Sequence, residues 1–201
     1  MLLKRRPPGI STEAPELLAG FEHLEGSAIA VVRWLNANKI DFVLVGPVAR
    51  AIRGEAGATG PVAIVPAPYR RNWERLCVAL IGERAGLRAE SAVRGPGAIP
   101  VASPVKLTAE KLSRGRRWLL RCGPYDLDIE GLPLPEAGSA PDNAPGYQEL
   151  LYEATRFEIA DGVSVEVAAP EDLEHYSHVR RTGSAPEFRV TRTGAAERHT
   201  A

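Results

Sequence analysis

Three acidic residues alternate along one short apolar segment, YDLDIE, at residues 125–130. Because successive side chains of a β-strand point to opposite faces, Asp126, Asp128 and Glu130 would share one face of a strand. Carboxylate oxygens are the ligands that Mg²⁺ prefers, so this face could form a metal site, with Asp126 and Asp128 as catalytic candidates. The competing interpretation is a row of strand residues that face solvent.

A second candidate site surrounds the turn after the apolar run IDFVLV, residues 40–45. Gly46 would let the backbone approach a phosphate, and Pro47 suits the first position of the helix that follows. The start of that helix favours an anion. Arg50 and Arg53 could add bidentate contacts to the phosphate, or they could be ordinary exposed positions of a short helix.

Two histidines near the end of the chain, His175 and His178, lie three residues apart beside Glu171 and Asp172. They could ligate a metal on one helix face. No further His or Cys lies nearby in the sequence to complete the ligand set, so a solvated helix is the preferred interpretation.

Basic residues gather between residues 106 and 117, where they could contact nucleic acid. No aromatic side chains alternate with them to stack on bases, and Lys+Arg and Asp+Glu both total 25 in the whole chain. A solvated loop is therefore preferred, and the same holds for the C-terminal arginines. The two sets are Lys106, Lys111, Arg114, Arg116 and Arg117 in the loop, and Arg180, Arg181, Arg189, Arg192 and Arg198 near the C-terminus.

Composition indicates a cytoplasmic protein. The 201 residues suffice for one compact domain. No apolar run reaches the length of about 18 residues that a membrane span needs. Cys77 and Cys122 lie in apolar contexts, which favours buried free thiols over a disulfide, and neither has a paired His or CxxC partner for chemistry.

Hydrophobic periodicity predicts an α/β (α+β) fold, a mixed sheet flanked by helices. A disordered segment is expected over residues 1–12, one domain over 13–183 and a flexible tail over 184–201. Residues 94–117 are expected to be an irregular connection with one helical turn near TAEKL. The expected elements are a helix over 28–35, a strand over 40–45, a helix from Pro47, a strand over 62–65, a helix over 70–84, strands over 118–122 and 125–130, a helix over 147–154, a hairpin over 157–167 and a helix from Pro170.

The stretch FVLVGPVARAIRGEAGATGPVAIVPAP, residues 42–68, resembles the nucleotidyltransferase superfamily, and the nearest branch is the minimal, AbiEii-like group of bacterial proteins. That pattern is a strand ending in Gly-Gly or Gly-Ser, a short helix, a loop ending in Thr and a strand carrying Asp-x-Asp. The order of elements is similar over residues 28–176. The resemblance implies a nucleotidyltransferase-like fold, with Gly46 and Thr59 beside a bound nucleotide.

The resemblance fails at the metal ligands. Pro61 and Ala63 stand at the two aspartate positions, and only Asp126 matches the family's third carboxylate. Two-metal nucleotidyl transfer needs several carboxylates to hold the ions in fixed geometry. Pro61 also lacks an N–H, so its strand should begin there or lie at a sheet edge. Pro47 replaces the second Gly or Ser of the turn.

The sequence therefore predicts a catalytically degenerate protein that acts as a binding or assembly module. It would need no cofactor, and it would retain some affinity for a nucleotide or another phosphate ligand at Gly46, Arg50, Arg53 and Thr59. A protein partner is the other expected ligand. The alternative is an active Mg²⁺-dependent nucleotidyltransferase, a toxin that modifies tRNA or protein through Asp126, Asp128 and Glu130. A third hypothesis is a nucleic-acid-associated protein.

Overall fold

The structure is a computed structural model that describes residues 6–11, 13, 15–88, 103–114, 117–130 and 146–174. The strands are β1 (Phe42–Val45), β2 (Val62–Pro66), β3 (Gly86–Leu87), β4 (Ser103–Pro104), β5 (Arg117–Cys122), β6 (Tyr125–Glu130), β7 (Thr155–Ala160) and β8 (Val163–Val167). The helices are α1 (Gly26–Ala37), α2 (Gly46–Ile52), α3 (Arg70–Gly82), α4 (Ala109–Arg114) and α5 (Tyr147–Glu153).

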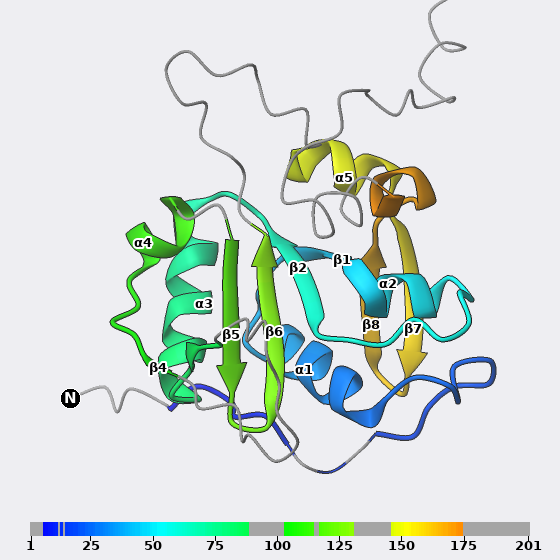
Figure 1. Cartoon of the computed structure of the whole chain (residues 1–201), viewed down its shortest axis with the longest axis horizontal. Helices are drawn as coiled ribbons and strands as arrows, with labels where there is room; N and C mark the ends of the chain where they lie inside the picture. Colours follow the sequence, from blue (N-terminus) through cyan, green and yellow to red (C-terminus); the bar gives the residue numbers. More distant parts are fainter. Residues whose placement is uncertain are drawn as a thin grey trace, which may run out of the picture.

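The described strands form one sheet in the order β4-β3-β5-β6-β2-β1-β8-β7. The pairs β2–β6 and β1–β8 are parallel and the other neighbouring pairs are antiparallel, so the sheet is mixed. Helices flank it on both sides, with α3 and α4 beyond β5 and the β7–β8 hairpin at the other end (Figure 1). The predicted α/β (α+β) class is confirmed.

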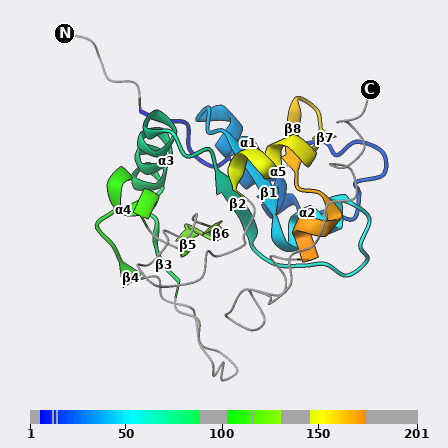
Figure 2. The same cartoon turned by 90° about the horizontal axis from the view of Figure 1, so that it is seen from above.

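The apolar core includes residues of the sheet and of helices on both of its sides: α1 and α3 share one side, and α2, which also contributes buried residues, lies on the other (Figure 2). The helix predicted over residues 28–35 is α1, and its buried side chains include Val32, Trp34 and Leu35. The strands β1 and β2 are buried throughout, as their continuous apolar runs predict.

Two proline positions set the boundaries of the central elements. Pro47 lies in the first turn of α2, where no N–H is needed. Pro61 immediately precedes β2, which lies inside the sheet between β1 and β6, so the strand begins after this residue and does not form an edge.

The predicted hairpin is present as β7 and β8, with Gly162 at φ +63° in its turn. Its strand β7 is the last strand of the described sheet. Leu17 pairs with Ala160, the Leu18 N–H donates to the Ile159 carbonyl at 3.2 Å, and the Asp161 N–H donates to a backbone carbonyl of the same N-terminal segment at 3.3 Å.

Some segments differ from the sequence prediction. Residues 6–11, the described part of the segment predicted to be disordered, contact the ends of two helices: Asn38 donates to the Pro8 carbonyl at 3.1 Å and the Ile10 N–H donates to Glu83 at 3.1 Å. The short strands β3 and β4 were not predicted. The predicted turn near TAEKL is α4.

The predicted last helix begins at Pro170 and continues through Glu174. The predicted tail over 184–201 lies outside the described residues. No helix in the described ranges is both long and apolar enough to cross a bilayer.

Candidate functional site

Ala63, at the position where the resemblance would place a second aspartate, lies deep in the sheet. Ala63 is fully buried and pairs with Val45 of β1 on one side and with Asp128 of β6 on the other. Because paired residues of neighbouring strands share a face, Ala63 and Asp128 lie on the same face of the sheet. The sheet therefore places one of the predicted acids beside the methyl group that occupies a ligand position of the family pattern.

The predicted catalytic residue Asp126 is held by two arginines. Arg121, its cross-strand partner on β5, donates from Nε to Oδ1 at 2.8 Å and from Nη2 to Oδ2 at 3.0 Å. Arg88 lies 3.0 Å away through Nη1. Burial raises the pKa of Asp126, but hydrogen bonds from Arg121 and Arg88 outweigh it, so the pKa lies below its usual value.

The other two acids continue the same pattern. Asp128 is completely buried, and its carboxylate lies 2.6 Å from Arg88 Nη2 and 3.5 Å from Arg117 Nη2. Glu130 lies 3.2 Å from Arg117 Nε. Arg88 reaches this face because its backbone N–H extends the β3–β5 pairing, donating to the carbonyl of Leu119 at 2.9 Å.

We call the six residues Arg88, Arg117, Arg121, Asp126, Asp128 and Glu130 the arginine–carboxylate ladder. The sequence prediction that the three acids share a face is confirmed by their strand register. Three guanidinium groups neutralise the three carboxylates, so a cation at this face would compete with arginines that already hold the oxygens. Within the described ranges, no group of three or more His, Cys, Asp or Glu side chains is arranged to hold a metal ion.

At the predicted phosphate turn, Gly46 has φ +71°, a left-handed backbone that suits glycine. The ring of Pro47 packs closely on Gly60, where an added Cβ would lie 2.8 Å from Pro47 Cγ. Thr59 is exposed in the adjoining loop. Pro47 therefore fills space beside the turn that a second Gly or Ser would leave open.

The predicted phosphate contact Arg50 has intramolecular partners. It lies 2.7 Å from Glu55 and 3.4 Å from Glu174, and it donates to the Leu173 carbonyl at 3.2 Å. These contacts connect α2 to the helix that begins at Pro170.

Arg53 is held similarly. It donates to the carbonyls of Ala168 at 2.7 Å and Val167 at 3.1 Å, and to the Thr155 hydroxyl at 3.1 Å. Its guanidinium lies 5.6 Å from the ring centroid of Phe157. Both arginines thus have structural partners, and nucleotide binding by Gly46, Arg50, Arg53 and Thr59 stays a prediction.

The described basic residues of the loop have contacts within the chain. Arg117 belongs to the ladder, Arg114 pairs with Glu110 at 2.8 Å, and Lys111 lies 3.4 Å from the Lys106 carbonyl. Arg116, His175, His178 and the C-terminal arginines lie outside the described residues.

Both cysteines are buried free thiols, as predicted. Burial raises the pKa of Cys77 and, together with Glu83 and Asp126, raises that of Cys122 to about 12. Neither thiol is activated as a nucleophile.

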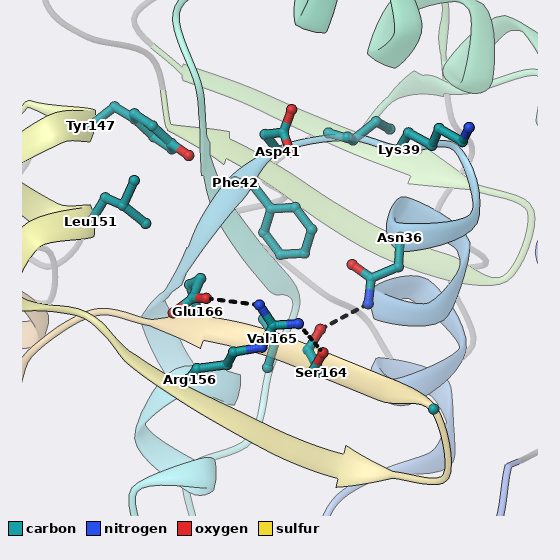
Figure 3. Close-up of a pocket in the computed structure, with 12 residues that line it drawn as sticks. Asn36, Lys39, Asp41, Phe42, Tyr147, Leu151, Arg156, Ser164, Val165 and Glu166 are labelled. Carbon is teal, nitrogen blue, oxygen red and sulfur yellow. Dashed lines mark hydrogen bonds and ion pairs between the residues drawn. The ribbon is translucent and has the colours of Figure 1, made fainter.

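A separate pocket opens where β1 and β8 diverge. These strands pair only at Leu44 and Val167. Beyond that pair, Asn36 at the end of α1 donates to the Ser164 carbonyl at 2.8 Å. The resulting space has a volume of about 510 Å³ and lies between α1, β1, β8 and α5 (Figure 3). We call it the β1–β8 pocket.

Tyr147 of α5 brings a mostly buried side chain and an accessible hydroxyl to this pocket. The residue is 8% exposed, and its hydroxyl is aimed into the pocket with no hydrogen-bond partner among the described residues (Figure 3). Burial raises the pKa of this hydroxyl, and the carboxylates of Asp41 and Glu166 raise it further. The hydroxyl therefore remains protonated at neutral pH and lies in a negative field.

The charged groups of the pocket are loosely paired. Asp41 hydrogen-bonds to Tyr69 and lies 3.6 Å from Arg75. Glu166 lies 3.6 Å from Arg156. Both ion-pair distances exceed a hydrogen bond, so the carboxylates keep acceptor capacity for a ligand.

Asn72, which is completely buried on α3, fixes the entry of β1 at this pocket. It accepts the Asp41 N–H at 2.9 Å and donates to the carbonyls of Asp41 at 2.8 Å and Ala67 at 3.1 Å. Hydrogen bonds from α3 thus fix the backbone that carries the Asp41 carboxylate.

Sequence reasoning identified neither Arg88 nor the β1–β8 pocket. Arg88 follows a strand of two residues, which leaves no periodic pattern. The pocket residues come from four elements, and only the pairing of β1 with β8 brings them together.

No protein-family model matches the chain, and no curated protein matches it significantly.

Proposed function

We propose that this chain is a nucleotidyltransferase-like protein that has lost nucleotidyl transfer and acts as a non-catalytic binding module. The observation that carries the proposal is the state of the face where metals would bind. Pro61 and Ala63 replace two acids, and the carboxylates of the neighbouring strand are neutralised by the arginines of the ladder.

The physical argument concerns charge. Two Mg²⁺ ions and a triphosphate need a site of net negative protein charge to hold the metals. Here Asp128 lies 2.6 Å from Arg88, and Asp126 is bound bidentately by Arg121. Releasing these carboxylates for a metal would break ion pairs to half-buried arginines and to the completely buried Asp128, which costs free energy.

The test is Mg²⁺-dependent incorporation of each labelled ribonucleotide into tRNA or protein. The proposal expects no incorporation. Incorporation that Asp126→Asn abolishes would overturn it and support the alternative of an active enzyme. A matched control is Glu110→Gln, which alters an exposed ion pair on α4 and should leave any measured activity unchanged.

Residual nucleotide binding is tested separately by thermal unfolding with millimolar ATP, CTP, GTP and UTP. A raised midpoint that Thr59→Val lowers would support the predicted contacts around Gly46. If no nucleotide raises the unfolding midpoint, the turn at Gly46 does not bind nucleotide and the binding role must belong to another surface.

A further inference from the structure

The β1–β8 pocket contains charged groups of both signs that a ligand can reach. Asp41 and Glu166 supply two carboxylates, while Lys39 and Arg156 supply two cations. The formal charges cancel. A purely anionic ligand would be repelled by the two carboxylates, and a purely cationic ligand would be repelled by the ammonium and guanidinium groups. A ligand with both charges satisfies each side.

The polar groups of the pocket lie on two sides, and one cation, Arg156, lies 3.6 Å from Glu166 and so beside a carboxylate. Tyr147 and Leu151 of α5 line one side of the pocket, and Asn36 and Lys39 at the end of α1 line the opposite side (Figure 3). On the α5 side, the carboxylates of Asp41 and Glu166 both raise the pKa of the Tyr147 hydroxyl, in addition to its burial. The Lys39 ammonium has no partner among the described residues and lies at the rim of the other side.

The Tyr147 hydroxyl points to a ligand independently of the charges. A phenol whose ring is buried usually finds a hydrogen-bond partner. This one has none in the described parts of the chain, although it lies in a space of about 510 Å³. The volume is in the range of pockets that hold small molecules, about 300–1,000 Å³. The apolar floor, which includes Phe42 and Val165, would take the uncharged part of such a molecule.

We propose that the β1–β8 pocket binds a small zwitterionic amino compound of the amino-acid class. Its ammonium group lies beside the Tyr147 hydroxyl and the carboxylates of Asp41 and Glu166, and its carboxylate faces the Lys39 side. The proposal rests on the non-catalytic binding role, and it gives that role a ligand class. Nucleotide incorporation tests the loss of catalysis and ligand titration tests the pocket, so either result can fail without the other.

The experiment is calorimetric titration and thermal unfolding of the full chain with the free L-amino acids as probes. For each probe that raises the unfolding midpoint, the matched amide lacks the carboxylate and the matched N-acetyl derivative lacks the ammonium. The expected result is binding of at least one L-amino acid, weaker binding of its amide and no binding of its N-acetyl derivative. No shift with any L-amino acid, or equal binding of the N-acetyl form, overturns the proposal.

Variants assign the binding to this pocket. Tyr147→Phe removes one hydroxyl and keeps the ring, and it should weaken binding about tenfold or more, the effect of a hydrogen bond to a charged group. Tyr152→Phe is the matched control, because Tyr152 lies on the same helix and is 72% exposed. Equal affinity of Tyr147→Phe and Tyr152→Phe would overturn the proposal.

A second pair of variants tests the other end of the ligand. Lys39→Gln should weaken binding of the amino acid but not that of its amide, whereas Lys106→Gln, at an exposed lysine near α4, should change neither. Loss of amide and amino-acid binding to the same extent in Lys39→Gln would contradict the proposed orientation.

Discussion

The ladder on β5 and β6 and the β1–β8 pocket use the same kinds of side chain in opposite ways. In the ladder, three arginines meet three carboxylates at distances from 2.6 to 3.5 Å, and the central acid Asp128 is completely buried. In the pocket, the two ion pairs are 3.6 Å long and a buried phenol has no partner among the described residues.

Burial and register account for the difference. In the ladder, Arg117 and Arg121 lie directly opposite Glu130 and Asp126 on a fully paired pair of strands, and Arg88 joins them from the end of β3. The pocket forms where β1 and β8 stop pairing, so only Glu166 has a directly opposite cross-strand partner, Arg156 of β7, and the other charges come from separate elements. The carboxylates of the ladder are occupied by hydrogen-bonded arginines, whereas the longer ion pairs of the pocket leave its carboxylates able to accept hydrogen bonds from a ligand.

The strongest test of this comparison is Asp128→Asn. It removes the central, completely buried carboxylate of the ladder, so that three half-buried arginines face only two carboxylates. We expect the free energy of unfolding to fall by about 3–5 kcal/mol. Urea denaturation measures it. Glu110→Gln, at an exposed ion pair with Arg114, should lower the free energy of unfolding by less than about 0.5 kcal/mol. Equal losses of stability in the two variants would show that the ladder contributes no more than an exposed ion pair.

A smaller effect is expected from Asn72→Leu, which keeps the side-chain size but removes three hydrogen bonds to the backbone of Asp41 and Ala67. The buried backbone groups left without partners should lower the free energy of unfolding by about 2–3 kcal/mol. Denaturation curves measure this loss, with Glu74→Gln on the exposed side of α3 as the control. Unchanged stability would show that the pocket wall does not depend on α3.

The third effect depends on pH. Because the pKa of Asp126 in the folded state lies below its ordinary value of 3.8, its ion pairs add stability above that pH and lose it as the pH falls through the folded value. Asp126→Asn should therefore cost about 1–2 kcal/mol at neutral pH and progressively less in acid. Denaturation midpoints of both proteins across this range measure the difference, and a constant difference would exclude the carboxylate charge as its cause.

The smallest effect on stability is expected in the pocket. Lys39 is exposed and has no ion pair among the described residues, so Lys39→Gln should change the free energy of unfolding by less than about 0.5 kcal/mol. The same denaturation assay measures it. A loss comparable to that of Asp128→Asn would show that the pocket charges are structural, and the contrast between the two regions would fail.

Sequence periodicity predicts the ladder acids well and the arginine partners less well. Strand alternation alone places Asp126, Asp128 and Glu130 on one face. The spacing of Arg117 and Arg121 in RWLLRC, before the Gly-Pro turn, is the sequence signal that indicates their pairing with the acids. Arg88 has no comparable signal, because it is about 40 residues distant and follows a strand too short to show alternation.

The pocket could not be predicted for a different reason. It depends on the parallel pairing of β1 with β8, two strands joined by a long connection, and on where that pairing ends. Local patterns specify neither property. The same patterns did predict the burial of β1 and β2 and the hairpin turn, because these depend on neighbouring residues.

The contact between Leu17 and Ala160 has a consequence for self-association. An open sheet edge offers unpaired N–H and C=O groups to any other chain. The N-terminal segment covers the hairpin end of β7, and the remainder of that strand presents the exposed charged side chains Arg156 and Glu158. Leu17 and its neighbours thus act as a cover against intermolecular strand pairing, a role separate from any ligand that the protein binds.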